Sequence, residues 1–335
     1  MDDFILDLFA QNDKLKATTV YQILAGKKTS SVLSYAYFHD LLAYFSAFPT
    51  LKKDAFFKIL KTLKSKGKLR IDENWQMQIL DKEDQTNRLS DLKNLDFFRY
   101  GKTYENCWRS VQLLVQAVSN LDKTKNYQPI ETSPLYTEPV RQVIVENREE
   151  ISQILYHEMQ HLFENISQEK ADFLASTLTG FNQNGQVYFQ LVSENYQKTP
   201  WAQLYFADAI HLFLQELTNQ RDFLLYHFLR NLLIANKGQS MLKTLQLSKQ
   251  GHTMKELVQL RHLKPGTIQD HLIEWSLQDP NFPFDQFISK DQWGKMEKLP
   301  KKSWNIPYKK ILEKTDLPFL ELRLYQIYEK GHKAC

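Results

Sequence analysis

The chain of 335 residues has few of the residues that break or cross-link a fold, with 10 glycines, 11 prolines and 2 cysteines. The cysteines, Cys107 and Cys335, lie far apart, which is typical of free thiols in a reduced compartment. No apolar run approaches the ~20 residues that a membrane-spanning helix needs, and the first residues lack the basic start of a signal peptide. We therefore expect a cytoplasmic protein without membrane segments or bound cofactors.

The residues that are abundant favour helices. Leu, Lys, Gln and Phe dominate, and a content of 42% hydrophobic and 13% aromatic residues argues against disorder. The length allows two or three domains, each with its own core. We predict an all-α, multi-domain protein with a winged-helix-like domain over residues 1–95, a helical middle domain over 96–236 and a helix-turn-helix domain over 237–335. One small β-hairpin, in the first domain, is the expected exception to the helical fold.

Charge is unevenly distributed along the chain, although the whole chain carries only +4. The net charge is +3 for residues 1–95, −5 for 96–236 and +6 for 237–335. Basic segments attract the phosphates of nucleic acids, so DNA contacts are expected at the two ends. The acidic middle is better suited to contact a protein, or a second copy of itself.

The first domain ends in a pattern typical of a wing. A helix is predicted over 54–66 and ends at Gly67, and residues 68–79 alternate apolar and polar on both sides of Glu73-Asn74. A hairpin directly after a helix resembles the wing of a winged helix. The basic residues around it are candidates for phosphate contacts, or are ordinary solvated side chains: Lys64, Lys66, Lys68 and Arg70.

Gly26-Lys27-Lys28-Thr29 invites comparison with a phosphate-binding loop, but the glycine needed five residues before Gly26 is replaced by Tyr21. We interpret the segment as a helix start capped by Thr29 or Ser30. Its free N–H groups, with Lys27 and Lys28, could hold a phosphate, and a plain capped turn is slightly favoured.

The middle domain reads as a succession of helices after a polar linker over 81–94. Helices are predicted over 104–121, 140–166, 168–178, 186–197, 203–218 and 221–236. Three prolines, Pro129, Pro134 and Pro139, predict a loop over 127–139.

Residues 241–275 show the most informative pattern, three short helices with breaks where a helix-turn-helix has them. Gly251 ends the first helix, and Thr253 with Glu256 forms an S/T-x-x-E capping box for the second. Pro265 suits the start of the third, whose Ile268 faces inward. The candidate DNA contacts of this segment are Lys249, Lys255, Arg261, Lys264, Thr267 and Gln269.

The third helix is poor in positive charge for a recognition helix. Only Lys264 lies near its start, and Asp270 and Glu274 would repel phosphate. Many helical hairpins of this kind contact no nucleic acid. An alternative interpretation is therefore that the domains predicted over 1–95 and 237–335 bind only protein.

One motif suggests an enzyme. His157-Glu158-Met159-Gln160-His161 is a literal HExxH, in which two histidines one helical turn apart can ligate zinc and the glutamate can polarise a bound water. Glu169 would be the third ligand. An apolar stripe through Ile151, Leu155, Met159, Leu162 and Ile166 places both histidines on the opposite side of the helix. We interpret the motif as a surface coincidence, with a zinc metallopeptidase as the alternative.

Residues 244–274 closely resemble the helicase-type helix-turn-helix at the C-terminus of some RecQ-family helicases. The chain as a whole looks like the YpbB-like proteins of Gram-positive bacteria, which are encoded beside a RecQ-type helicase. The residues that carry the resemblance are Gly251, Thr253, Glu256, Leu257, Arg261, Leu263, Thr267, Ile268, His271, Leu272 and Glu274, with Phe319–Leu324 near the C-terminus and Tyr21–Ser31 near the N-terminus.

The resemblance implies a non-enzymatic DNA-binding accessory factor that works with a RecQ-type helicase in replication, recombination or repair. A helix-turn-helix transcription regulator is the competing DNA-binding interpretation. Neither the residues nor the resemblance indicates an oligomeric state.

Overall fold

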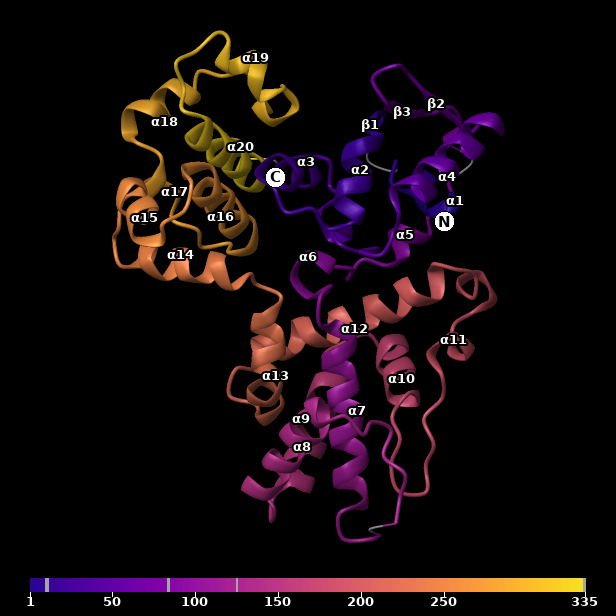
Figure 1. Cartoon of the computed structure of the whole chain (residues 1–335). Coiled ribbons are helices and arrows are strands. Elements are labelled where there is room, and N and C mark those ends of the chain that lie inside the picture. The colour runs from indigo at the N-terminus through magenta and orange to yellow at the C-terminus, as the bar shows by residue number, and fades with distance from the viewer. Residues whose placement is uncertain (10–11, 83–84, 125, 334–335) are drawn as a thin grey trace. The chain divides into compact units, whose positions relative to one another are not determined.

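A computed structural model describes residues 1–9, 12–82, 85–124 and 126–333, so that Cys335 lies outside the described residues. It confirms the predicted fold class, because the chain is mostly helical with one small sheet (Figure 1). No helix in the described part of the chain is long and apolar enough to span a membrane. The buried Cys107 is a free thiol.

The residues group into two compact units. The first comprises Met1–Asp7, Gln85–Asp96 and Tyr100–Asn236, and the second comprises Leu8–Asp84, Phe97–Arg99 and Lys237–Cys335. The first contains 12 Lys and Arg against 20 Asp and Glu, and the second contains 31 against 19. We call them the acidic unit, with a net charge of −8, and the basic unit, with +12.

This grouping differs from the expected division into three consecutive domains, which stays a prediction about independent folding. The segments expected to form separate N- and C-terminal domains lie together in the basic unit. Apolar periodicity identifies helices but does not show which helices pack together, and here helix α3 (Ser30–Phe38) packs on α16 (Pro265–Gln278) and α20 (Phe319–Lys333).

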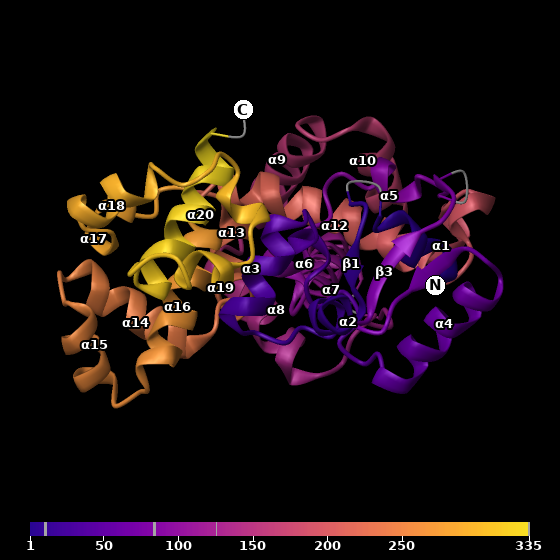
Figure 2. The ribbon, with the colours of Figure 1, turned by 90° about the horizontal axis from the view of Figure 1, so that it is seen from above.

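The N-terminal half of the basic unit contains the sheet. Its elements are β1 (Leu15–Lys16), α2 (Ala17–Leu24), α3, the 3-10 helix η1 (Leu42–Tyr44), α4 (Lys53–Ser65), β2 (Leu69–Ile71) and β3 (Gln76–Ile79). The predicted hairpin is confirmed, since β2 and β3 pair antiparallel with Leu69 opposite Ile79. Sequence reasoning missed β1, because a two-residue strand shows no alternation. β1 pairs with β3, as their neighbouring labels in Figure 2 indicate, and completes the order β1-β3-β2.

The C-terminal half of the basic unit is helical. It contains α14 (Gln239–Lys249), α15 (Met254–Arg261), α16, α17 (Phe284–Phe287), α18 (Lys290–Met296), the 3-10 helix η4 (Ser303–Asn305), α19 (Tyr308–Leu312) and α20. One apolar core runs through these helices, with Leu257, Ile268, Ile273 and Leu322 fully buried. This core fixes α14, α15 and α16 relative to one another.

Among its described residues, the acidic unit has helices and an isolated β-bridge between Gly180 and Gln183, but no strand. It contains α1 (Asp2–Asp7), α5 (Arg88–Asp91), α7 (Tyr104–Asn120), α8 (Pro134–Glu146), α9 (Ile151–Glu164), α10 (Gln168–Ser176), α11 (Tyr188–Leu191), the 3-10 helix η3 (Glu194–Tyr196), α12 (Trp201–Asn219) and α13 (Leu224–Ala235). The short helix α6 (Phe97–Tyr100) spans the boundary between the units.

Three expectations for this unit are wrong. Pro139 lies inside α8 and not in a loop, because Ser133 caps this helix, Pro134 occupies its first turn, and a single interior proline removes only one backbone hydrogen bond. The helix predicted over 140–166 is divided at residues 147–150 into α8 and α9. The helix predicted over 186–197 is divided at residues 192–193 into the short helices α11 and η3.

The expected linker over 81–94 is in part a docked segment, with residues 83–84 outside the described range. The Asp7 carboxylate accepts hydrogen bonds from the Thr86 backbone N–H and hydroxyl, each at 2.7 Å. Asn94 donates its backbone N–H to Asp208 at 2.7 Å, and Asp208 also pairs with Lys170 at 3.0 Å in the interior. These bonds hold the segment on the acidic unit.

Candidate nucleic-acid interface

Helix α4 exposes a row of lysines. Its buried side chains, Phe56, Leu60 and Leu63, recur at three and four residues and therefore form one face of the helix. A second set recurs at intervals of three and is exposed: Lys58, Lys61 and Lys64. Among the described residues these three lysines form no ion pair. Their charges therefore face solvent and are available to an anionic partner.

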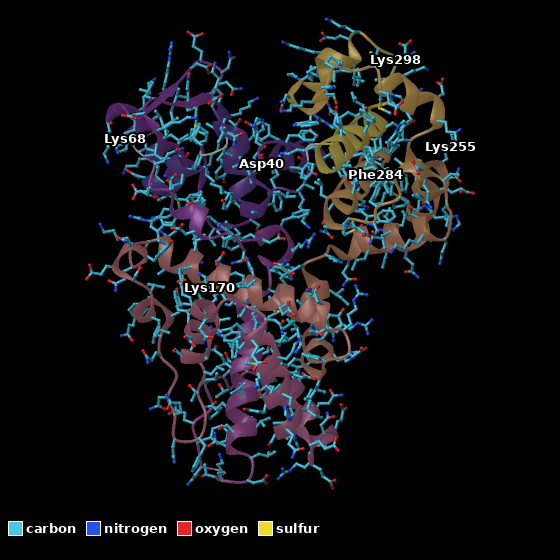
Figure 3. The ribbon with its side chains drawn as sticks, turned by 180° about the vertical axis from the view of Figure 1, so that it is seen from behind. Asp40, Lys68, Lys170, Lys255, Phe284 and Lys298 are labelled. Atoms are coloured by element: carbon cyan, nitrogen blue, oxygen red, sulfur yellow. The ribbon has the colours of Figure 1, made fainter. Side chains whose placement is uncertain are left out.

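The basic character of α4 continues into the hairpin. Between Lys52 and Arg70 the chain has eight lysines and arginines and one acidic residue, Asp54. β2 buries Leu69 and exposes Arg70, and Lys68, labelled in Figure 3, immediately precedes this strand. Sequence reasoning identified the part of this surface nearest the hairpin and missed Lys52, Lys53, Lys58 and Lys61. The sequence signal that could have identified these lysines is their regular spacing between the apolar positions of α4.

The helix-turn-helix begins as the sequence predicts. Gly251, at φ +89°, follows α14, and His262 takes a left-handed conformation at φ 50° in the turn after α15. The capping box is complete: Thr253 Oγ1 accepts from the Glu256 N–H at 3.4 Å, and Glu256 Oε2 accepts from the Thr253 N–H at 2.7 Å. The Thr253 N–H and the Thr253 hydroxyl, which donates to the same oxygen at 2.9 Å, hold the pKa of Glu256 below its usual value.

Two polar contacts fix the angles between these helices. Thr244 Oγ1 on α14 lies 2.9 Å from His271 Nδ1 on α16, and burial lowers the pKa of His271. Arg261, a candidate DNA contact, donates from Nη2 to the backbone oxygen and the hydroxyl of Ser240, at 3.1 and 2.9 Å. Arg261 therefore holds α15 against α14.

The acidic face of α16 is turned toward α3. Lys28 Nζ lies 2.6 Å from Glu274 Oε1, and the Ser30 backbone N–H donates to Asp270 Oδ1 at 2.8 Å. Asp270 thus accepts one of the free N–H groups at the start of α3, where Thr29 is the N-cap. Lys28 was a candidate phosphate ligand and is instead paired with a buried carboxylate.

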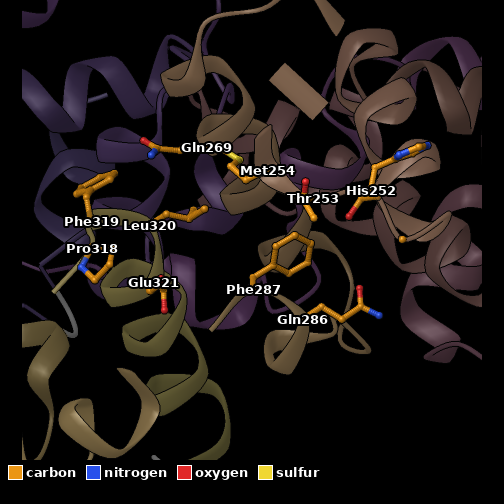
Figure 4. A pocket seen from close by; sticks show the side chains of 12 residues that line it. His252, Thr253, Met254, Gln269, Gln286, Phe287, Pro318, Phe319, Leu320 and Glu321 are labelled. Carbon is orange, nitrogen blue, oxygen red and sulfur yellow. The ribbon is translucent and has the colours of Figure 1, made fainter. Parts of the chain in front are cut away.

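The other candidate residues divide by exposure. Five are exposed: Lys27, Lys66, Lys249, Lys255 and Lys264. Thr267 and Gln269 are half-buried, and Gln269 lines a cleft of about 620 Å³ between the α14–α15 turn, α16 and the start of α20 (Figure 4). Their contacts with DNA stay a prediction.

Comparisons with known proteins agree with this geometry. Residues 240–326 match a family model described as a helix-turn-helix domain. The C-terminal segment is a helix-turn-helix domain. Such a domain suggests DNA binding. The chain is also 25% identical over 186 residues to Protein YpbB of Bacillus subtilis (strain 168), which covers 54% of this chain and 53% of that protein. The chain thus spans about half the length of that curated relative, and no solved structure matches.

The HExxH segment lies on α9, and its glutamate has another role. Glu158, expected at the surface, is buried at 9% exposure, so that expectation is wrong. Its two carboxylate oxygens accept the backbone N–H groups of Leu224 at 2.6 Å and Leu225 at 2.9 Å, the first residues of α13. Burial raises the pKa of Glu158, and these two hydrogen bonds act in the opposite direction. The carboxylate caps a helix.

The remaining candidate zinc ligands do not converge on a site. His161 packs edge-on against Phe223, with ring centroids 5.4 Å apart, and His157 is exposed. Glu169 accepts a hydrogen bond from the Tyr205 hydroxyl. In the part of the chain that the structure describes, no group of three or more His, Cys, Asp or Glu side chains is arranged to hold a metal ion.

Proposed function

We propose that this protein is a DNA-binding accessory factor, without catalytic chemistry of its own, that works with a RecQ-type helicase. The observation that carries the DNA-binding part is the row of exposed lysines on α4, continued by the basic hairpin. It lies in a unit of net charge +12 that also contains the helix-turn-helix domain. A helix followed by a hairpin in this position supports the winged-helix interpretation of the N-terminal half.

Binding should depend on phosphates and show little sequence preference. Base reading needs exposed side chains such as Arg, Asn or Gln on a helix that enters the major groove. On α16 the acidic residues Asp270 and Glu274 contact α3, and Gln269 is half-buried. This favours a factor that recognises DNA by its backbone over a transcription regulator with one short target sequence.

The test is a titration of the full chain with a labelled fork and a labelled random duplex at several salt concentrations. The slope of log K against log salt is negative. Replacing Lys58, Lys61 and Lys64 with glutamine should reduce its magnitude by about 2.7, at about 0.9 per phosphate contact. At 0.1 M salt this corresponds to roughly 500-fold weaker binding than the parent.

A matched control removes the same charge elsewhere in the basic unit. Lys309, Lys310 and Lys314 are also exposed, and their replacement with glutamine should leave the slope unchanged. Equal losses in the two triple variants would show that net charge alone attracts DNA, and the α4 interface would be wrong.

The helicase partnership rests on the resemblance to the YpbB-like proteins, and the acidic unit is suited to it. This unit has a net charge of −8 and exposes large apolar side chains, namely Ile130, Leu135, Val145, Tyr156, Phe181, Val187 and Phe189. Complementary charge accelerates association with a basic partner, and apolar side chains supply buried area.

A pull-down with the purified helicase tests the partnership. Glu146, Glu149 and Glu150 are exposed at and after the end of α8, and their replacement with lysine should weaken capture of the helicase. DNA binding by the same variant is the control, because α4 is unchanged. If the variant captures the helicase as well as the parent does, the helicase does not bind through this surface.

A further inference from the structure

A buried arginine in the basic unit has no acidic partner. Arg323 on α20 is 8% exposed, and its Nη1 donates to Gln326 Oε1 at 2.9 Å. Among the described residues it forms no ion pair, and its Nε has no hydrogen-bond partner. Burial lowers the pKa of Arg323 to about 10, which leaves the guanidinium charged at neutral pH.

Aromatic rings surround the guanidinium. Its central carbon lies 4.6 Å from the ring centroid of Tyr308, 5.5 Å from that of Phe38 and 5.9 Å from that of Phe319. Cation–π attraction offsets part of the cost of burying the charge, but these rings supply no hydrogen-bond acceptor for the guanidinium.

Arg323 also lines a cavity of about 420 Å³ between α2, α3 and the segment from η4 to α19. The lining contains the aromatic residues Tyr35, Phe38, Trp304 and Tyr308, and contains no Asp or Glu. Lys16, from the edge strand β1, adds a second positive charge at the wall. The cavity therefore combines a cationic, hydrogen-bonding wall with flat apolar surfaces.

We propose that this cavity binds a nucleotide, with a phosphate on Arg323 and the base against the aromatic rings. A guanidinium presents its N–H groups in a fork that matches phosphate oxygens, and aromatic side chains stack on bases of any sequence. A volume of this size lies within the range of small-molecule sites. The choice of a nucleotide over another aromatic anion rests on the proposed function in DNA metabolism.

The experiment measures binding of dTMP, thymidine and inorganic phosphate to the full chain by isothermal titration calorimetry. dTMP should bind at least about tenfold more tightly than thymidine, because only dTMP offers the charged acceptor. Arg323→Met should remove that advantage, and Lys309→Met, an exposed charge on the neighbouring α19, should preserve it. Equal affinity for dTMP and thymidine, or an unchanged advantage in Arg323→Met, would overturn the proposal.

A second variant covers the case in which Arg323→Met fails to fold. Ser31 is exposed on the first turn of α3 and lines the cavity, so Ser31→Trp should block the cavity without touching Arg323. Loss of dTMP binding in this variant, with an unchanged melting temperature, supports the site. Retained binding places the nucleotide elsewhere and refutes it.

Two further arms identify the source of the nucleotide and separate this inference from DNA binding by α4. In the variant with glutamine at Lys58, Lys61 and Lys64, a 5′-phosphorylated (dT)4 that binds as well as dTMP indicates a strand end, whereas exclusion of the oligonucleotide indicates a free nucleotide. If the unsubstituted chain binds duplex DNA but not dTMP, the nucleotide proposal for the cavity is wrong and the α4 interface stands. If it binds dTMP but not duplex DNA, the α4 interface is wrong and the nucleotide proposal stands. If the chain binds an acidic peptide and does not bind dTMP, the assignment of a nucleotide as the ligand is also wrong.

Discussion

Replacement of Glu158 by glutamine should destabilise the acidic unit. The buried carboxylate accepts two backbone N–H groups at the start of α13, at 2.6 and 2.9 Å. Glutamine keeps one acceptor oxygen and places an NH2 group against the other donor. Losing one hydrogen bond to a charged group costs about 1.5–3 kcal/mol. For a unit of this size that corresponds to roughly 3–12 °C in melting temperature.

Thermal and urea unfolding measure the effect, with Glu164→Gln as the matched control. Glu164 lies on the same helix, is exposed, and accepts a hydrogen bond from Gln160 that glutamine can also accept. The control should melt within about 2 °C of the parent, because exposed substitutions change stability by about 0.5 kcal/mol at most. An unchanged melting temperature in Glu158→Gln, with one zinc per chain lost on mutation of His157 and His161, would refute the capping role and support a zinc site.

The other predictions concern a buried histidine and the joint between the two halves of the basic unit. Burial lowers the pKa of His211 to about 3, so the folded state holds it neutral while the unfolded chain binds a proton below about pH 6.5. Stability is therefore lost as the pH falls, by about 1.6 kcal/mol between pH 6.5 and 5, and His211→Gln should remove this share of the pH dependence in urea titrations. A double-mutant cycle on Lys28 and Glu274 should give a coupling of about 1 kcal/mol, since the pair is only partly exposed, and a value of zero would argue against their 2.6 Å contact.

Local sequence signals predicted the elements of the helix-turn-helix well. Thr253, Glu256, Gly251 and Pro265 each act on the backbone within four residues of their own position, and each has the predicted role. The hairpin over 69–79 was likewise predicted from the alternation of apolar and polar residues along its strands. In these cases the residues that determine the conformation are neighbours in the sequence.

Long-range partners could not be predicted from the same signals. Asp270 and Glu274 were unfavourable residues for a DNA-reading helix until the structure placed Ser30 and Lys28 opposite them. Glu158 fitted a zinc motif, and its actual partners lie 66 and 67 residues away along the chain. A single sequence shows that a side chain is polar but not which distant group satisfies it.

The interleaved order of the two units has a consequence for synthesis on the ribosome. About 150 residues separate the two long segments of the basic unit, Leu8–Asp84 and Lys237–Cys335. The end of α3 precedes the ends of α16 and α20 by 240 and 295 residues, so at about 5–20 residues per second α3 would wait roughly 12–60 s for both to be made. All segments of the acidic unit have been made by then, so it can fold first. A translational pause after Asn236 would prolong the exposure of α3, and we expect it to increase aggregation of the nascent chain.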